Sequence, residues 1–196
     1  MKVPTSYKEI TVEQYMKAYE IMNDDFEDEI DRTTSLVAYF TGESFNFAEC
    51  MNGNEYKAIA EKLSFLKFDL PLFPISEFVS IGKQMFTPTK SLTQMKVNQM
   101  IDFQSIYKAN GNNISKCLDK LLPIVYVQKE YDPNKHEQNV ELFKQVKVSE
   151  VSGLVFFYSD YWLNVEKTIQ IYIEKQSKLI QERMDWIVAN PQYLHS

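Results

Sequence analysis

No proline and a single glycine, Gly153, occur in residues 149–189, SEVSGLVFFYSDYWLNVEKTIQIYIEKQSKLIQERMDWIVA. A stretch of about 40 residues without a helix breaker predicts one long α-helix of roughly 60 Å. Its first part, from Val151 to Trp162, is apolar on nearly every side and is expected to be buried. The long C-terminal helix therefore places the chain in the mainly α class.

Farther along this helix the apolar residues thin to one stripe, which Ser177 interrupts. Together with the tryptophan ahead of it, the stripe is the candidate protein interface, made of Trp162, Ile169, Ile173, Ile180, Met184 and Ile187. Such a face suits a partner helix or a second copy in a symmetric assembly. Packing back on the same chain after a kink is the alternative, and the sequence leaves both open.

The chain ahead of the long helix predicts an irregular helical domain with a small β-hairpin insert. Helices are expected over residues 12–22, 26–40, 45–51, 54–65, 97–107, 114–122 and 136–143, with Pro123 ending the sixth. Pro71 and Pro74 exclude a helix between the fourth and fifth, and Phe78–Phe86 alternates around Gly82 as a hairpin would. The expected divisions are 1–67, an N-terminal helical subdomain; 68–91, a proline-rich segment with the hairpin; and 92–196, a helical subdomain that ends in the long helix.

Three of these helices begin in the same way. The segments Ile10–Gln14, Met95–Gln99 and Val146–Glu150 share the frame apolar, polar, valine, polar, and then glutamine or glutamate. This order is typical of a helix start that combines a hydrophobic staple with a side chain reaching back to the cap. We interpret the frame as one solution used three times, with a duplicated module as the alternative.

The charges disfavour a nucleic-acid binder. The chain carries 27 acidic and 21 basic residues, a net charge of −6, and only Arg32 and Arg183 are arginines. A nucleic-acid binder needs a basic face for the phosphates, and bidentate contacts to phosphate or guanine need arginine. We expect no specific nucleic-acid binding.

The densest charge cluster is acidic and lies within residues 24–31. Its carboxylates could hold Mg²⁺ or Ca²⁺, but the spacing is not that of an EF-hand loop. A helix N-terminus attracts acidic side chains by its dipole, so a solvated helix start is the favoured interpretation.

Residue types that carry out catalysis are sparse. The chain has two cysteines and two histidines, with no zinc-ligand spacing, and it lacks phosphate-binding glycine loops and a nucleophile elbow. We predict no enzyme, no cofactor and two free thiols that serve as small apolar residues. The longest strongly apolar run, Leu154–Tyr158, is too short for a membrane span, and the start of the chain has no apolar leader, which indicates a protein made in a reducing cytoplasm.

Several segments together resemble one family over nearly the whole chain. They are Val3–Tyr15, Tyr39–Gly42, the hairpin through Gly82, Met95–Phe103, Leu122–Tyr126 and Gly153–Phe157. In this order they are similar to a family of small virion and tail-associated proteins of tailed bacteriophages, especially crAss-like phages of gut Bacteroides. The resemblance implies no catalytic residues, because the family pattern supplies none.

The resemblance implies two functions. Members are labelled as tail assembly chaperones, and in crAss-like phages similar proteins are cargo carried in the portal and tail and expelled with the genome. The expected function is a non-enzymatic cargo protein with portal and tail proteins as partners and several copies in a symmetric assembly. The alternative is a tail assembly chaperone that binds a tail protein during morphogenesis and is absent from the mature virion.

Overall fold

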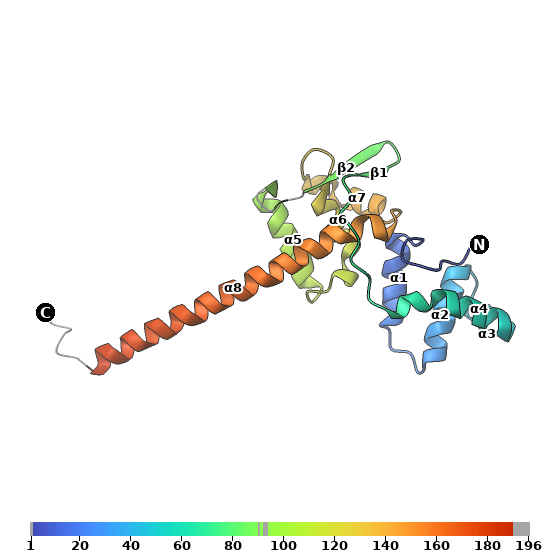
Figure 1. The fold of residues 1–196 in the computed structure, drawn as a ribbon, viewed down its shortest axis with the longest axis horizontal. Coiled ribbons are helices and arrows are strands. Elements are labelled where there is room, and N and C mark those ends of the chain that lie inside the picture. Colours follow the sequence, from blue (N-terminus) through green and yellow to red (C-terminus); the bar gives the residue numbers. More distant parts are fainter. Residues whose placement is uncertain (1, 90, 92–93, 190–196) are drawn as a thin grey trace. The chain divides into compact units, whose positions relative to one another are not determined.

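The computed structural model describes residues 2–89, 91 and 94–189. Within the long C-terminal helix, it leaves the side chains of residues 162, 163, 165, 166, 168–170, 172, 183 and 186–189 undescribed. The fold is mainly α with one small antiparallel sheet (Figure 1), which confirms the predicted fold class. The chain forms two compact units, Met1–Phe156 and Phe157–Ser196, and each is considered by itself.

The elements follow one another in chain order. They are α1 (Val12–Met22), α2 (Glu29–Thr41), α3 (Phe45–Glu49), α4 (Gly53–Leu63), η1 (Ser64–Lys67), β1 (Val79–Ile81), β2 (Gln84–Pro88), α5 (Val97–Ala109), η3 (Ile114–Lys116), α6 (Leu118–Val125), β3 (Tyr126–Val127), η4 (Pro133–Lys135), α7 (His136–Phe143) and α8 (Val148–Ala189).

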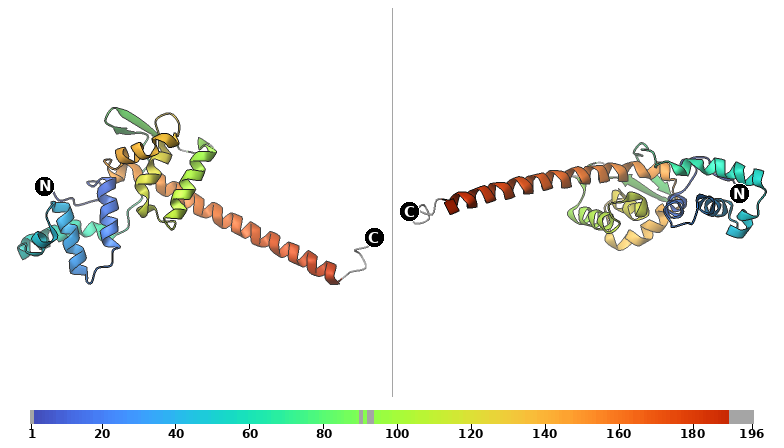
Figure 2. Two further views of the ribbon diagram at one scale, coloured as in Figure 1. Left: turned by 180° about the vertical axis from the view of Figure 1, so that it is seen from behind. Right: turned by 90° about the horizontal axis from the view of Figure 1, so that it is seen from below.

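The predicted hairpin is present and has a third strand beside it. β1 and β2 pair antiparallel on either side of a turn in which Gly82 takes φ +59°, a conformation that favours glycine. β3 pairs with the other edge of β2, through Thr87 opposite Val127 and Pro88 opposite Tyr126. Figure 2 shows this hairpin in green at one edge of the first unit. The pairing with β3 supplies the support that an isolated hairpin needs.

The core of the first unit centres on α6. Its apolar side chains at Leu121, Leu122 and Ile124 are fully buried, and α6 packs against α1, α5 and α7. Because α1 also packs against α2, this one helix joins the N-terminal helices to the α6 core.

Pro123 does not end α6, contrary to the prediction. The helix continues to Val125 with Pro123 inside it. A proline removes its own backbone donor and its ring crowds the carbonyl four residues earlier, but here the side chains of the helix are almost all buried. The burial of Leu121, Leu122 and Ile124 outweighs one missing hydrogen bond.

Two helix starts also differ from the prediction. The segment from Ile114 is a 3₁₀ turn, and Cys117, with φ −146°, separates it from α6. The second helix begins at Glu29 instead of Phe26, because Asp28 caps it: its carboxylate accepts a hydrogen bond of 2.8 Å from the backbone N–H of Asp31.

The starts of α1 and α8 pair with each other. The N–H of Val12 donates to the carbonyl of Val146 at 2.8 Å, and the N–H of Val148 donates to the carbonyl of Ile10 at 3.1 Å. Thr11 and Lys147 form the antiparallel bridge between these two bonds. The first backbone donors of a helix have no partner within it, so each of these two helix starts satisfies a donor of the other.

Two of the three shared frames, Ile10–Gln14 and Val146–Glu150, therefore hold equivalent positions in this pairing of helix starts. Ile10 corresponds to Val146 and Val12 to Val148, and all four side chains are buried. Thr11 and Gln14 form the predicted capping box, with hydrogen bonds of 3.0 and 3.2 Å. In the third frame, the side chain of Gln99 accepts a hydrogen bond from the N–H of Lys96, but Val97 is exposed.

The proline-rich segment crosses the start of α8 at Gly153. An added Cβ at Gly153 would overlap the carbonyl oxygen of Phe73. Ser76 secures the crossing, because its hydroxyl donates to the carbonyl of Glu150 at 2.7 Å. The one glycine of the long helix thus permits the close approach of another backbone.

Replacing Gly153 by alanine should destabilise the first unit by about 2 kcal/mol, because the methyl group displaces backbone that cannot turn aside as a flexible side chain can. Urea unfolding followed by circular dichroism measures the change. The matched control is Gly53→Ala in α4, where nothing lies within 4 Å of the added Cβ. The control should be neutral or slightly stabilising, and an equal loss in both variants would contradict the crossing.

The valines of the three shared frames offer a second test. Val12→Ala and Val148→Ala should each lower the free energy of unfolding by about 2 kcal/mol, because both side chains are fully buried. Val97→Ala removes the same atoms from a side chain that is 73% exposed and should change stability by less than about 0.5 kcal/mol. Equal effects at all three positions would contradict the burial of Val12 and Val148 and the exposure of Val97.

Candidate protein-binding surface

The predicted interface stripe lies on an unbroken helix. α8 is continuous from Val148 to Ala189, so the stripe and the buried start of α8 belong to one helix. Ile173, Ile180 and Met184 are 52%, 58% and 56% exposed. At 100° per residue these three positions share one face of the helix. The side chains of Trp162, Ile169 and Ile187 lie outside the described residues.

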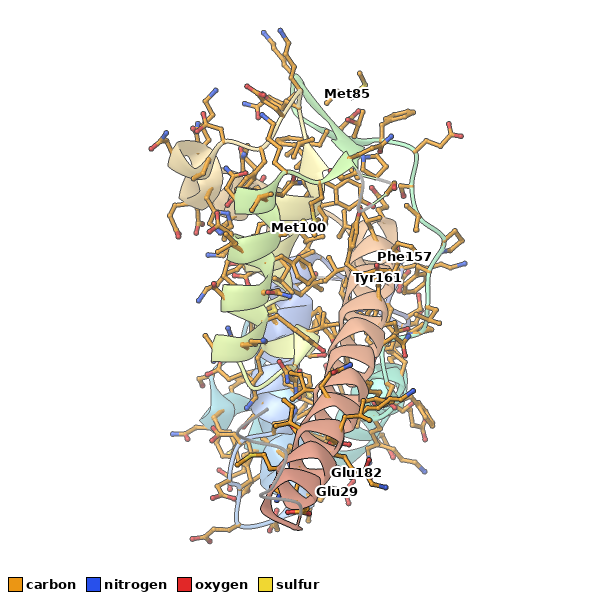
Figure 3. All side chains as sticks on the ribbon, turned by 90° about the vertical axis from the view of Figure 1, so that its left-hand side faces the viewer. Glu29, Met85, Met100, Phe157, Tyr161 and Glu182 are labelled. Atoms are coloured by element: carbon orange, nitrogen blue, oxygen red, sulfur yellow. The ribbon has the colours of Figure 1, made fainter. Side chains whose placement is uncertain are left out.

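The first part of α8 is buried all round only as far as Val155, which corrects the expectation that burial would extend to residue 162. Val151, Leu154 and Val155 are fully buried. Phe157 and Tyr161 are 47% and 42% exposed and follow each other one turn apart on the same side of α8 (Figure 3). Aromatic side chains in this position leave apolar surface open on the second unit.

A second apolar pattern in α8 does not follow from the 3.6-residue spacing and was not predicted. Apolar residues also recur at alternating steps of three and four residues, a heptad repeat with a positions at 162, 169, 176 and 183 and d positions at 165, 172, 179 and 186. All four d residues are apolar, whereas the a positions 176 and 183 hold Gln176 and Arg183. Of these eight side chains, the structure describes Gln176, partly exposed, and Leu179, 44% exposed. A count of the 3.5-residue period would have revealed the repeat.

The predicted stripe overlaps this repeat. Trp162 and Ile169 hold two of its a positions, and Ile173 and Ile180 fall at its e positions, next to the a and d positions. On the other side, the g positions hold Lys175 and Glu182, both exposed. The exposed isoleucines thus widen an apolar face whose other edge is charged.

A separate apolar surface belongs to the first unit. In the proline-rich segment, Phe68, Leu72 and Phe78 are 72%, 74% and 56% exposed to solvent. Met85 on the hairpin is 58% exposed. Figure 3 shows Met85 on this hairpin. The sequence predicted a proline-rich segment with a hairpin at residues 68–91, and it gave no indication that this segment exposes large apolar side chains.

Two of the clefts among the described residues of the first unit are larger than about 600 Å³. One, of about 640 Å³, is lined by both charges, including Glu13, Lys17, Asp119 and Lys144. The other, of about 1010 Å³, lies between the hairpin and the turn before α7. Within the described part of the chain, no three His, Cys, Asp or Glu side chains come together as a metal ion would require.

The acidic cluster belongs to the start of α2. Asp28 is the N-cap, and Glu29 and Asp31 lie in the first turn. Glu29 also binds Lys67 by a surface ion pair of 2.5 Å, which lowers the pKa of its carboxyl. The carboxylates at this end of α2 therefore serve the helix start, as the sequence predicted.

The cysteines occupy different environments. Cys117 is fully buried, and its thiol donates to the carbonyl of Asn113 at 3.3 Å. Burial raises the pKa of the Cys117 thiol to about 12, so the reactive thiolate is almost absent at neutral pH. Cys50 is exposed.

His136 is half-buried at the start of α7. Its ring packs edge-on against Tyr131, and its buried Nδ1 has no hydrogen-bond partner. Burial lowers the pKa of the imidazole, which favours the neutral form. The environment is that of a packing residue.

No known protein family, curated protein or solved structure matches this chain. Among the described residues, no helix combines the length and the apolar composition that crossing a membrane requires.

The thiols give a direct test of the first unit. In the native protein, a thiol reagent near neutral pH should modify Cys50 rapidly and Cys117 only on denaturation, because Cys117 is buried and its pKa is raised. Counting modified thiols with and without urea measures this, and Cys50→Ser is the control that should leave no fast reaction. Fast modification of Cys117 in the native protein would contradict the α6 core.

Proposed function

We propose that this chain is a non-enzymatic component of a bacteriophage particle. It is made in the host cytoplasm, held in several copies by portal and tail proteins, and expelled with the genome as cargo. The observation that carries the proposal is the exposed apolar face of α8, where Ile173, Ile180 and Met184 are each more than half exposed. Contiguous apolar surface of this kind is typical of protein interfaces.

The construction of the first unit is compatible with passage through a narrow channel. A folded domain must unfold to pass an opening narrower than itself, and Cys50 and Cys117 are free thiols, so they place no covalent loop in the way. Many of the helix contacts join neighbours in sequence, such as α2 with α3 and α6 with α7. Local contacts of this kind favour rapid refolding on the far side.

A tail assembly chaperone is the second candidate, and the proline-rich segment is the observation that favours it. Phe68, Leu72 and Phe78 are exposed on an irregular segment of the first unit. A chaperone uses exposed apolar surface to hold its client and then departs. Both candidates act by contact, and they differ in whether the chain remains in the particle.

Mass spectrometry of purified, nuclease-treated particles tests the proposal. Cargo should be present in several copies per particle, at a constant ratio to the portal protein across a density gradient. Absence from the particle, combined with recovery in complex with a tail protein from infected cells, would replace the proposal by the chaperone. Absence both from the particle and from complexes with tail proteins would contradict the cargo proposal and the chaperone alternative alike.

Variants on two sides of α8 show whether its apolar face is the contact. Ile173→Asp combined with Ile180→Asp should reduce incorporation into particles at least tenfold, because a charge in a buried interface is costly. The matched control is Ile171→Asp, at a residue of the same type that is 65% exposed on the opposite side of the same helix. Equal incorporation of all variants would show that α8 does not hold the chain in the particle.

A further inference from the structure

We propose that the second unit pairs with the same unit of a second copy, as an antiparallel two-stranded coiled coil in one defined register. In this register Lys175 of each copy lies beside Glu182 of the other. The inference deepens the proposed function by naming what covers the apolar face of α8, but it is tested on purified protein alone. Its failure and the failure of the particle proposal are therefore distinguishable.

The heptad repeat supplies the seam. It extends from residue 162 to residue 186, three and a half heptads and roughly 37 Å of helix. A repeat of this length with apolar d positions is the pattern of a coiled coil. At its centre, Gln176 and Leu179 are partly exposed in the single chain, so a second helix has room to bury them.

The charges select antiparallel pairing. In a parallel pair each g position faces an e position of the other helix, so Lys175 would face Ile180 and no charge would be matched. The two a positions of a layer would also coincide and place Arg183 beside Arg183. In an antiparallel pair, a positions face d positions and the g positions of the two helices face each other.

One antiparallel register matches both edges at once. When Gln176 faces Leu179 of the second copy, Lys175 faces Glu182 on one edge and Ile173 faces Ile180 on the other. The two-fold axis repeats both pairs, so the match occurs twice. All four of these edge side chains are exposed in the single chain.

The neighbouring registers are disfavoured by the same charges. A shift by one heptad in one direction places Lys175 beside Lys175, and a shift in the other direction places Glu182 beside Glu182. Like charges at these positions repel. On the outward side of the helix, the side chain of Gln181 donates a hydrogen bond of 2.8 Å to Asp185 of the same helix. The sequence thus encodes one self-complementary alignment.

Charge exchange tests the register. Sedimentation equilibrium of the full chain at low ionic strength should show a reversible dimer. Lys175→Glu and Glu182→Lys should each weaken it about tenfold or more, because each variant turns two attractive pairs into two repulsive ones. A mixture of the two single variants should form a heterodimer at least as tight as the original dimer, since both contacts between positions 175 and 182 of the two copies then join opposite charges.

The matched control is Lys178→Glu, which makes the same change of charge at an exposed position on the outward side and should leave the dimer unchanged. Circular dichroism verifies that each variant keeps its helix content. A chain that stays monomeric in the original form, or a mixture that associates no better than the single variants, would overturn the proposal. Equal weakening by Lys178→Glu would overturn it as well, because the effect would then be one of net charge.

Discussion

The structure depends on the backbone pairing of residues 10–12 with residues 146–148. Two hydrogen bonds, from Val12 to Val146 and from Val148 to Ile10, join segments 136 residues apart. The N–H of Glu13 adds a third bond to the carbonyl of Lys144, just after α7. The free donors at the start of α1 are thereby matched with carbonyls beyond the end of α7, which fixes both helices against α6. The position at which α8 begins follows from the same contact.

Local structure that depends on neighbouring residues could be predicted from the sequence, whereas contacts between segments far apart in the chain could not. The capping box of Thr11 and Gln14, the glycine at the hairpin turn and the unbroken length of α8 depend on neighbouring residues, so the pattern indicated them. The three shared frames were also visible. The sequence did not show that two of these frames pair with each other, because the residues at a helix start do not indicate which distant segment they will contact. Pro123 inside α6 belongs with this second kind, since the packing of α6 against other helices overrides a local preference.

The candidate surface was predicted in part for a similar reason. An exposed stripe at Ile173, Ile180 and Met184 follows from helical spacing, and the structure places these side chains in the open. The heptad seam shares Trp162 and Ile169 with this stripe, but its period of 3.5 residues differs from that of a straight helix, so helical spacing did not indicate its d positions. The exposed Phe68 had no periodicity to reveal it, because the segment that holds it is neither helix nor strand.

The contact between the two helix starts also orders events during synthesis. At about 5–20 residues per second, residue 148 leaves the peptidyl-transfer centre roughly 7 to 27 s after residue 12. Throughout that interval the backbone of Ile10 and Val12 lacks its native partner at residues 146–148, and the nascent chain carries an unpaired edge. A ribosome that stalls before residue 146 therefore leaves a chain that cannot close, however well its individual helices have formed.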